Sequence, residues 1–84
     1  MNSILWTVKA ARQLRKLDRQ HQMAIRDGVS GLVTMPDCLH VKALVNHQYG
    51  YRLRIANYRI FFDWDGKIRI VEIQEVKKRD ERTY

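Results

Sequence analysis

The sequence has few of the residues that cross-link or interrupt a chain: 84 residues include one cysteine, one proline and four glycines. Cys38 can form no internal disulfide and lacks a second cysteine for a zinc site, which is typical of a protein of the cytoplasm. No apolar run approaches the roughly 18 residues that span a membrane, and no signal peptide follows Met1. Because linkers and repeats are also missing, we expect residues 1–84 to form a single domain without a membrane partner.

Acidic residues are scarce as well. Nine Asp and Glu stand against sixteen Lys and Arg, so the net charge is +7. This balance favours a polyanionic partner, either nucleic acid or an acidic protein. The hydrophobic fraction of 45% is sufficient for a folded core, and the charged residues are therefore expected on the surface.

The first half of the chain predicts a short strand, Ser3 to Trp6, followed by a helical hairpin. Thr7 and Asp18 are the predicted N-caps of its two helices. The second helix contains Gly28 and Gly31, each of which costs about 1 kcal/mol relative to alanine. We therefore expect this helix either to fray after Val29 or to pack very close to a neighbour.

After Pro36 the apolar period changes from helical to two, beginning near His40. Asp65-Gly66 is the strongest short hairpin signal, and Ile68 to Val76 is predicted to be the returning strand. The order predicts an α+β fold, in which an N-terminal strand and a helical hairpin pack on one face of a small antiparallel sheet of about three meander strands.

The stretch YRLRIANYRIFF, residues 51–62, places three arginines in the predicted core hairpin. A two-residue turn at Ala56-Asn57 pairs Arg54 with Arg59 and puts Arg52 opposite Phe61. A two-residue turn at Asp65-Gly66 would put Arg59 opposite Glu72. All three arginines then share one face, and the other face receives an apolar set: Tyr51, Leu53, Ile55, Tyr58, Ile60, Phe62, Val71 and Ile73.

Two interpretations of this arginine face stay open. The side chains are either solvated and neutralised in part by Glu72, or they form a phosphate site, which converging planar guanidinium groups suit. The run KKRDER near the C-terminus is either a frayed tail or an extension of the same basic face. Tyr84 offers a ring on which a base could stack.

The pattern YRLRIANYRIFF, the D-G hairpin and IRIVEIQEVKKRDERTY together resemble the RelE/ParE superfamily of toxins from bacterial toxin–antitoxin systems. In the RelE branch, the resemblance implies a toxin that cleaves mRNA in the ribosomal A site and inhibits translation. The RNA 2'-hydroxyl attacks the adjacent phosphate and leaves a 2',3'-cyclic phosphate. The catalytic positions implied are Arg52, Arg54, Arg59, Arg79 (or Lys78) and Tyr84, and the expected RNA-binding residues are Lys77, Lys78, Arg82 and His47.

RelE has lysines where this chain has Arg52 and Arg54, and an arginine is a poor general base. These arginines would then act as electrostatic clamps, and the base could be a histidine, His47 in preference to His40. No metal or small-molecule cofactor is implied. The expected partner is a DNA-binding antitoxin with an acidic or amphipathic segment. Two alternatives remain, a ParE-like inhibitor of DNA gyrase and a catalytically inert nucleic-acid-binding relative.

Overall fold

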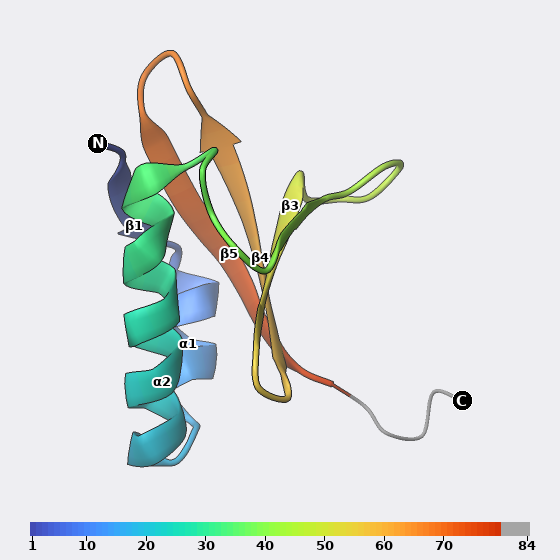
Figure 1. The fold of residues 1–84 in the computed structure, drawn as a ribbon. Coiled ribbons are helices and arrows are strands. Elements are labelled where there is room, and N and C mark those ends of the chain that lie inside the picture. Colours follow the sequence, from blue (N-terminus) through green and yellow to red (C-terminus); the bar gives the residue numbers. More distant parts are fainter. Residues whose placement is uncertain (80–84) are drawn as a thin grey trace.

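The computed structural model describes residues 1–79, and these form two α-helices, a short 3-10 helix and a five-stranded sheet (Figure 1). The elements in chain order are β1 (Ser3–Trp6), α1 (Val8–Arg15), α2 (Arg19–Ser30), η1 (Gly31–Thr34), β2 (Val41–Ala43), β3 (Tyr51–Ile55), β4 (Tyr58–Asp65) and β5 (Ile70–Lys78). The strands lie in the order β1-β5-β4-β3-β2. The predicted α+β class is confirmed.

The sheet is mixed rather than wholly antiparallel, because β1 pairs parallel to β5 while β2 to β5 form an antiparallel meander. The meander has four strands, since the three-residue β2 adds to the three predicted. Both α-helices lie on one face of the sheet, α1 along β5 and α2 against β3 (Figure 1). The other face is left open by the helices.

The helical hairpin begins as predicted. The Thr7 hydroxyl accepts a hydrogen bond from the Ala10 N–H at 3.1 Å and caps α1. Asp18 occupies the N-cap position of α2 without a side-chain capping bond. The α2 helix ends at Ser30, and a Cβ added to Gly28 would overlap the Ile55 side chain, so the helix both stops early and packs closely on β3.

The helix-side face of the sheet supplies the core. Of the eight apolar residues predicted there, six are buried, and Tyr51 and Ile55 are half-buried against them. Asn2 ties the N-terminus to this core: its side-chain amide donates to the carbonyls of Leu32, Val33 and Met35, and its oxygen accepts from the indole of Trp64 at 3.0 Å. This buried polar side chain therefore has its hydrogen bonds satisfied.

The β3–β4 register agrees with the prediction, with Ile55 opposite Tyr58, Arg54 opposite Arg59, and Arg52 opposite Phe61. The β4–β5 register was predicted wrongly. Asp65 pairs with Ile70 across a four-residue loop, and a bulge between Phe61 and Phe62 shifts the pairing once more.

The conformation of this loop explains the difference. A two-residue Asp-Gly turn requires a positive φ at Gly66, which Gly66 does not have. Instead, the Asp65 carboxylate accepts from the N–H groups of Lys67 and Ile68, and Arg69 takes the positive φ of 55°. As a result, Arg59 faces Lys77 rather than Glu72.

Candidate nucleic-acid interface

Cationic side chains lie on two adjoining cross-strand levels of the open face, and we call them together the basic row: Lys42, Arg52, Arg54, Arg59 and Lys77. Lys42 on β2 lies opposite Arg52 on β3. Arg54 on β3 lies opposite Arg59 on β4, which in turn lies opposite Lys77 on β5. The sequence predicted that the three arginines share a face, and the structure places two lysines in register with them.

No member of the basic row forms a salt bridge with a carboxylate of residues 1–79, and Glu75, which lies opposite Phe61 on the same face, is paired with Lys9 at 2.7 Å. Glu72, the expected partner of Arg59, lies opposite Asp63 instead and accepts a hydrogen bond from the Gln74 amide. Like charges directly opposed across a ladder destabilise a sheet. The arrangement is therefore suited to an anion that binds between them.

The register also separates the two candidates for the C-terminal cation. Lys78 pairs with the buried Tyr58, so its position belongs to the helix-side face. The Arg79 N–H donates to the Asn57 carbonyl at 2.6 Å, which extends the ladder by one residue and places Arg79 in phase with Lys77. Arg82 and Tyr84 lie outside the described residues.

The two histidines considered as bases have different surroundings. His47, in the loop between β2 and β3, stacks on Phe61 with ring centroids 5.1 Å apart. Its Nδ1 accepts the Tyr49 N–H at 3.0 Å, so in the neutral ring the proton is on Nε2 and neither nitrogen is available to accept another. His40 is exposed and contributes its carbonyl to the Arg54 N–H.

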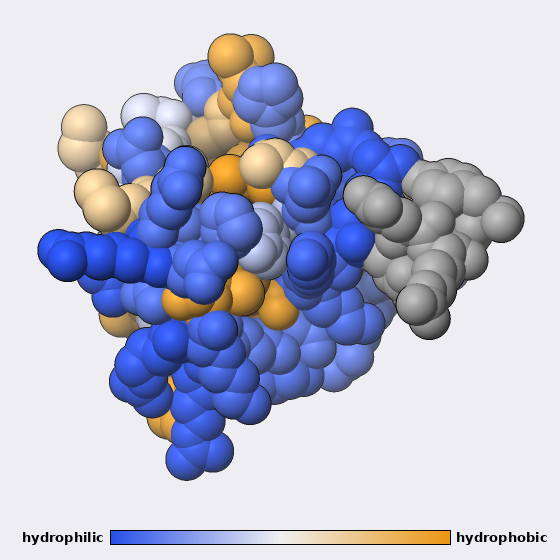
Figure 2. Space-filling view, turned by 90° about the horizontal axis from the view of Figure 1, so that it is seen from below, coloured by the Kyte–Doolittle hydropathy of each residue, from blue (hydrophilic) through white to orange (hydrophobic). Residues whose placement is uncertain are grey.

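Charge is distributed unevenly along the open face. Toward the β4–β5 loop, the Asp63 carboxylate accepts from the Gly50 N–H at 2.8 Å and from the Gln74 amide at 3.1 Å. Near the middle, the hydrogen bond to Glu75 raises the pKa of Lys9 above its ordinary value of 10.5. Arg54, Arg59 and Lys77 of the basic row lie toward the opposite end, by the Ala56-Asn57 turn. Figure 2 shows that end of the molecule, where hydrophilic side chains dominate around small apolar areas.

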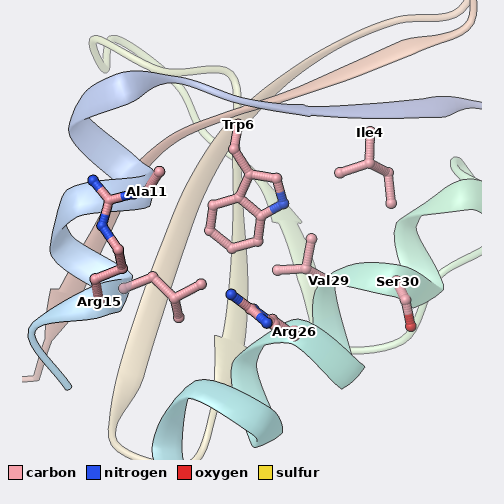
Figure 3. Close-up of a pocket in the computed structure, with 8 residues that line it drawn as sticks. Ile4, Trp6, Ala11, Arg15, Arg26, Val29 and Ser30 are labelled. Atoms are coloured by element: carbon pink, nitrogen blue, oxygen red, sulfur yellow. The ribbon is translucent and has the colours of Figure 1, made fainter. Parts of the chain in front are cut away.

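The helix-side face carries a separate hollow of about 440 Å³ between β1, α1 and α2 (Figure 3). Trp6, Leu14 and Val29 line it with apolar surface, and Arg15 and Arg26 add two guanidinium groups to its lining. It lies on the opposite side of the sheet from the basic row. Within residues 1–79 no group of three or more His, Cys, Asp and Glu residues could hold a metal ion.

Comparison with known proteins identifies the family. Residues 4–83 match the family model described as the ParE toxin of the type II toxin-antitoxin system parDE. The chain belongs to this family. It is thus a toxin of the RelE/ParE superfamily, as the sequence pattern indicated. No curated protein sequence matched it.

Solved structures support the toxin fold. The isolated RelE toxin of E. coli superposes with a TM-score of 0.81 at 14% identity, covering 99% of this chain and 89% of that one. A chain of a RelBE toxin–antitoxin complex from Mycobacterium tuberculosis gives 0.78 at 22% identity, covering 93% and 98%. A chain of the RelE-RelB complex from Pyrococcus horikoshii gives 0.79 at 19% identity, covering 95% and 97%. At these identities the likeness shows a shared fold.

Two features of the toxin's open face were missed by sequence reasoning. Lys42 was not identified because β2 is too short for its alternation to fix a register. The stacking of His47 on Phe61 depends on how the loop of residues 44–50 returns over the sheet, which no periodicity reports.

No helix in residues 1–79 is long and apolar enough to cross a membrane.

Proposed function

We propose that this toxin is a ribosome-dependent mRNA endonuclease that cleaves in the A site and so inhibits translation. The observation that carries the proposal is the basic row, in which cations from four strands face one another without a carboxylate partner among residues 1–79. Guanidinium groups bind phosphate through paired, charge-assisted hydrogen bonds. An RNA backbone laid across the row would relieve the repulsion between its members.

The reaction needs little covalent participation by the protein. The RNA 2'-hydroxyl oxygen forms a bond to the adjacent phosphorus, the bond to the 5'-oxygen breaks, and the products are a 2',3'-cyclic phosphate and a free 5'-hydroxyl. Negative charge accumulates on the phosphorane oxygens in the transition state. Arg52, Arg54 and Arg59 would stabilise that charge by preorganised electrostatics, a contribution that is often the largest single one in catalysis.

Proton transfer is assigned differently from the sequence-based hypothesis. The guanidinium groups of Arg52 and Arg54 offer donors and no acceptor, and Nδ1 of His47 is occupied by a backbone N–H. The proposal therefore gives these three residues roles in binding and charge stabilisation; the 2'-hydroxyl proton would pass to solvent water, and the departing 5'-oxygen would take a proton from water. Arg79 continues the row toward the C-terminus, where Tyr84 would supply a further stacking ring.

The proposed macromolecular partners are the translating ribosome with its mRNA, in the cytoplasm, and a cognate antitoxin. The matching chain from M. tuberculosis was solved in a toxin–antitoxin complex, and that from P. horikoshii in a RelE-RelB complex. A net charge of +7 suits an antitoxin with an acidic, amphipathic segment, and we infer that this partner also binds DNA. By covering the basic row, such a segment would exclude RNA.

The test is induced expression in a bacterial host, followed by primer extension on cellular mRNA. The wild-type toxin is expected to arrest growth and to produce cuts that map to ribosomal A sites. Arg59→Ala should lower cleavage by about 10²- to 10³-fold, as expected for loss of one transition-state donor. Arg19→Ala removes the same charge from the exposed start of α2 and should leave cleavage unchanged. Growth arrest without A-site cuts would refute the proposal.

The family model favours a second candidate, since it is described for a ParE toxin. Under the gyrase-inhibitor hypothesis, expression would induce a DNA-damage response without mRNA cleavage, and the response would survive Arg59→Ala and Tyr84→Phe. A catalytically inert relative would instead bind RNA in a strongly salt-dependent manner and give no product with ribosomes.

A further inference from the structure

The loop between β2 and β3, residues 44–50, holds an aromatic ring at the surface of the open face. His47 is exposed, yet it stacks on Phe61 with an interplanar angle of 12°. Phe61 itself is only 8% exposed, because the loop covers it. One face of the imidazole is therefore packed against protein, and the other is left toward solvent.

This ring is held in a fixed orientation. The Tyr49 N–H donates to Nδ1 at 3.0 Å, and the Tyr49 ring lies 5.9 Å away at a tilt of 46°. Tyr49 is buried and also packs against Phe61 with centroids 5.9 Å apart. A ligand that stacks on His47 would therefore lose little side-chain entropy in ordering the platform, which favours affinity.

The platform adjoins the basic row. Phe61 lies directly opposite Arg52 across the β3–β4 ladder, and directly opposed residues on one face have Cβ atoms roughly 4.5–5.5 Å apart. His47 therefore stacks on Phe61, the residue directly opposite Arg52. A flat ring beside a cation is the combination that holds an unpaired nucleotide, with its base on the aromatic ring and its phosphate on the guanidinium.

We propose that His47 is a stacking platform for one unpaired base of the bound RNA, with the phosphate of that nucleotide held by Arg52. The identity of the polymer rests on the proposed function. Because Nδ1 is occupied, His47 contributes its π-face and an outward Nε2–H donor. A base inside a duplex has both faces covered, so the platform selects single-stranded RNA.

The test is a thermodynamic cycle on binding of a short fluorescent single-stranded RNA, measured by anisotropy at low salt without ribosomes. His47→Ala should weaken binding about 5- to 100-fold, the range for loss of one base–aromatic stack. A set of RNAs with one abasic site each should include a position where removal of the base weakens wild-type binding by a similar factor. At that position His47→Ala should cause no further loss, since the base and the ring would be the two halves of one contact.

Three controls make the cycle specific. His47→Phe keeps a flat ring and should retain most of the affinity, whereas Gln48→Ala alters the neighbouring exposed residue of the loop and should change nothing. Duplex RNA of the same sequence should bind wild type and His47→Ala equally. Thermal melts of each variant show whether the fold is intact.

Additive losses at every abasic position, or His47→Phe as weak as His47→Ala, would overturn the inference. These outcomes are separable from failure of the proposed function. A-site cleavage in cells with no coupling in the cycle refutes the stacking platform alone. Coupling in the cycle without A-site cleavage refutes the endonuclease and leaves His47 as a base-binding residue.

Discussion

Substitution of Arg59 by glutamine is expected to stabilise the fold of the toxin and to lower the proposed mRNA cleavage. Arg59 is half-buried on β4 and has a cation directly opposite on each side, Arg54 on β3 and Lys77 on β5. Cross-strand charge pairs contribute roughly 0.2–1 kcal/mol each, and like charges act against the fold. Glutamine keeps much of the aliphatic stem, so packing changes little while two repulsive pairs disappear.

The expected gain in the free energy of unfolding is therefore about 1 kcal/mol, from two pairs in the middle of that range. For a domain of this size, 1 kcal/mol raises the melting temperature by roughly 4–8 °C. The repulsion is electrostatic, so the gain should shrink in about 1 M NaCl, where the Debye length falls to about 3 Å. Sulfate or phosphate should stabilise wild type more than the variant, because the anion would bind between Arg59 and the two cations that repel it.

Calorimetric or circular-dichroism melts of wild type and Arg59→Gln at low and high salt measure both effects. Arg19→Gln, an equal loss of charge on α2, serves as the control and should stay within about 0.5 kcal/mol of wild type, as surface substitutions usually do. A variant that melts lower than wild type at low salt, or a gain that persists in 1 M NaCl, would show that the basic row is not under electrostatic strain.

Four further substitutions concern the scaffold. Asn2→Ala should cost about 2–4 kcal/mol in urea unfolding, because buried carbonyls and an indole N–H lose their partner; a loss under 1 kcal/mol would mean that water replaces the amide. Gly28→Ala should destabilise by about 1–3 kcal/mol through overlap with Ile55. Gly31→Ala meets nothing within 4 Å and should gain up to about 1 kcal/mol, so equal effects at the two glycines would contradict the packing argument. Because the pKa of Lys9 is raised in the folded state, its contribution to the free energy of unfolding should be constant from neutral pH to near 10.5 and then fall as the amine deprotonates. Thermal melts of wild type and Lys9→Met should therefore converge at pH values above this range. Melting temperatures that stay equally far apart at every pH would contradict the shift.

Local chemistry was enough to predict the β3–β4 hairpin. Alternation in YRLRIANYRIFF fixes which side chains share a face, and the two-residue turn at Ala56-Asn57 fixes their pairing, so the observed register follows directly. The start of the helical hairpin was equally predictable, since Thr7 caps α1 through the Ala10 N–H. In each case the information lies within a few residues of the feature it determines.

The β4–β5 register could not be predicted from the sequence, because a tight turn and a longer loop compete at Asp65-Gly66. Asp65-Gly66 is compatible with a tight turn, but the Asp65 carboxylate stabilises a longer loop by accepting two backbone N–H groups. The bulge then lets Ile73 and Val76, three residues apart, both face the core. Burial of the apolar residues outweighed the local turn preference.

This register change has a consequence for the site. With Arg59 opposite Glu72, the arginines would have carried their own counter-ion, and solvated side chains would have explained them. With Arg59 between Arg54 and Lys77, and with the neighbouring Glu75 already paired with Lys9, an anion from outside the described sheet is required to pair with these cations. An RNA phosphate and an acidic antitoxin segment would both satisfy that requirement at the same cations. Competition for the basic row is therefore the simplest physical basis for neutralising the toxin, and raising the salt concentration should weaken both complexes together.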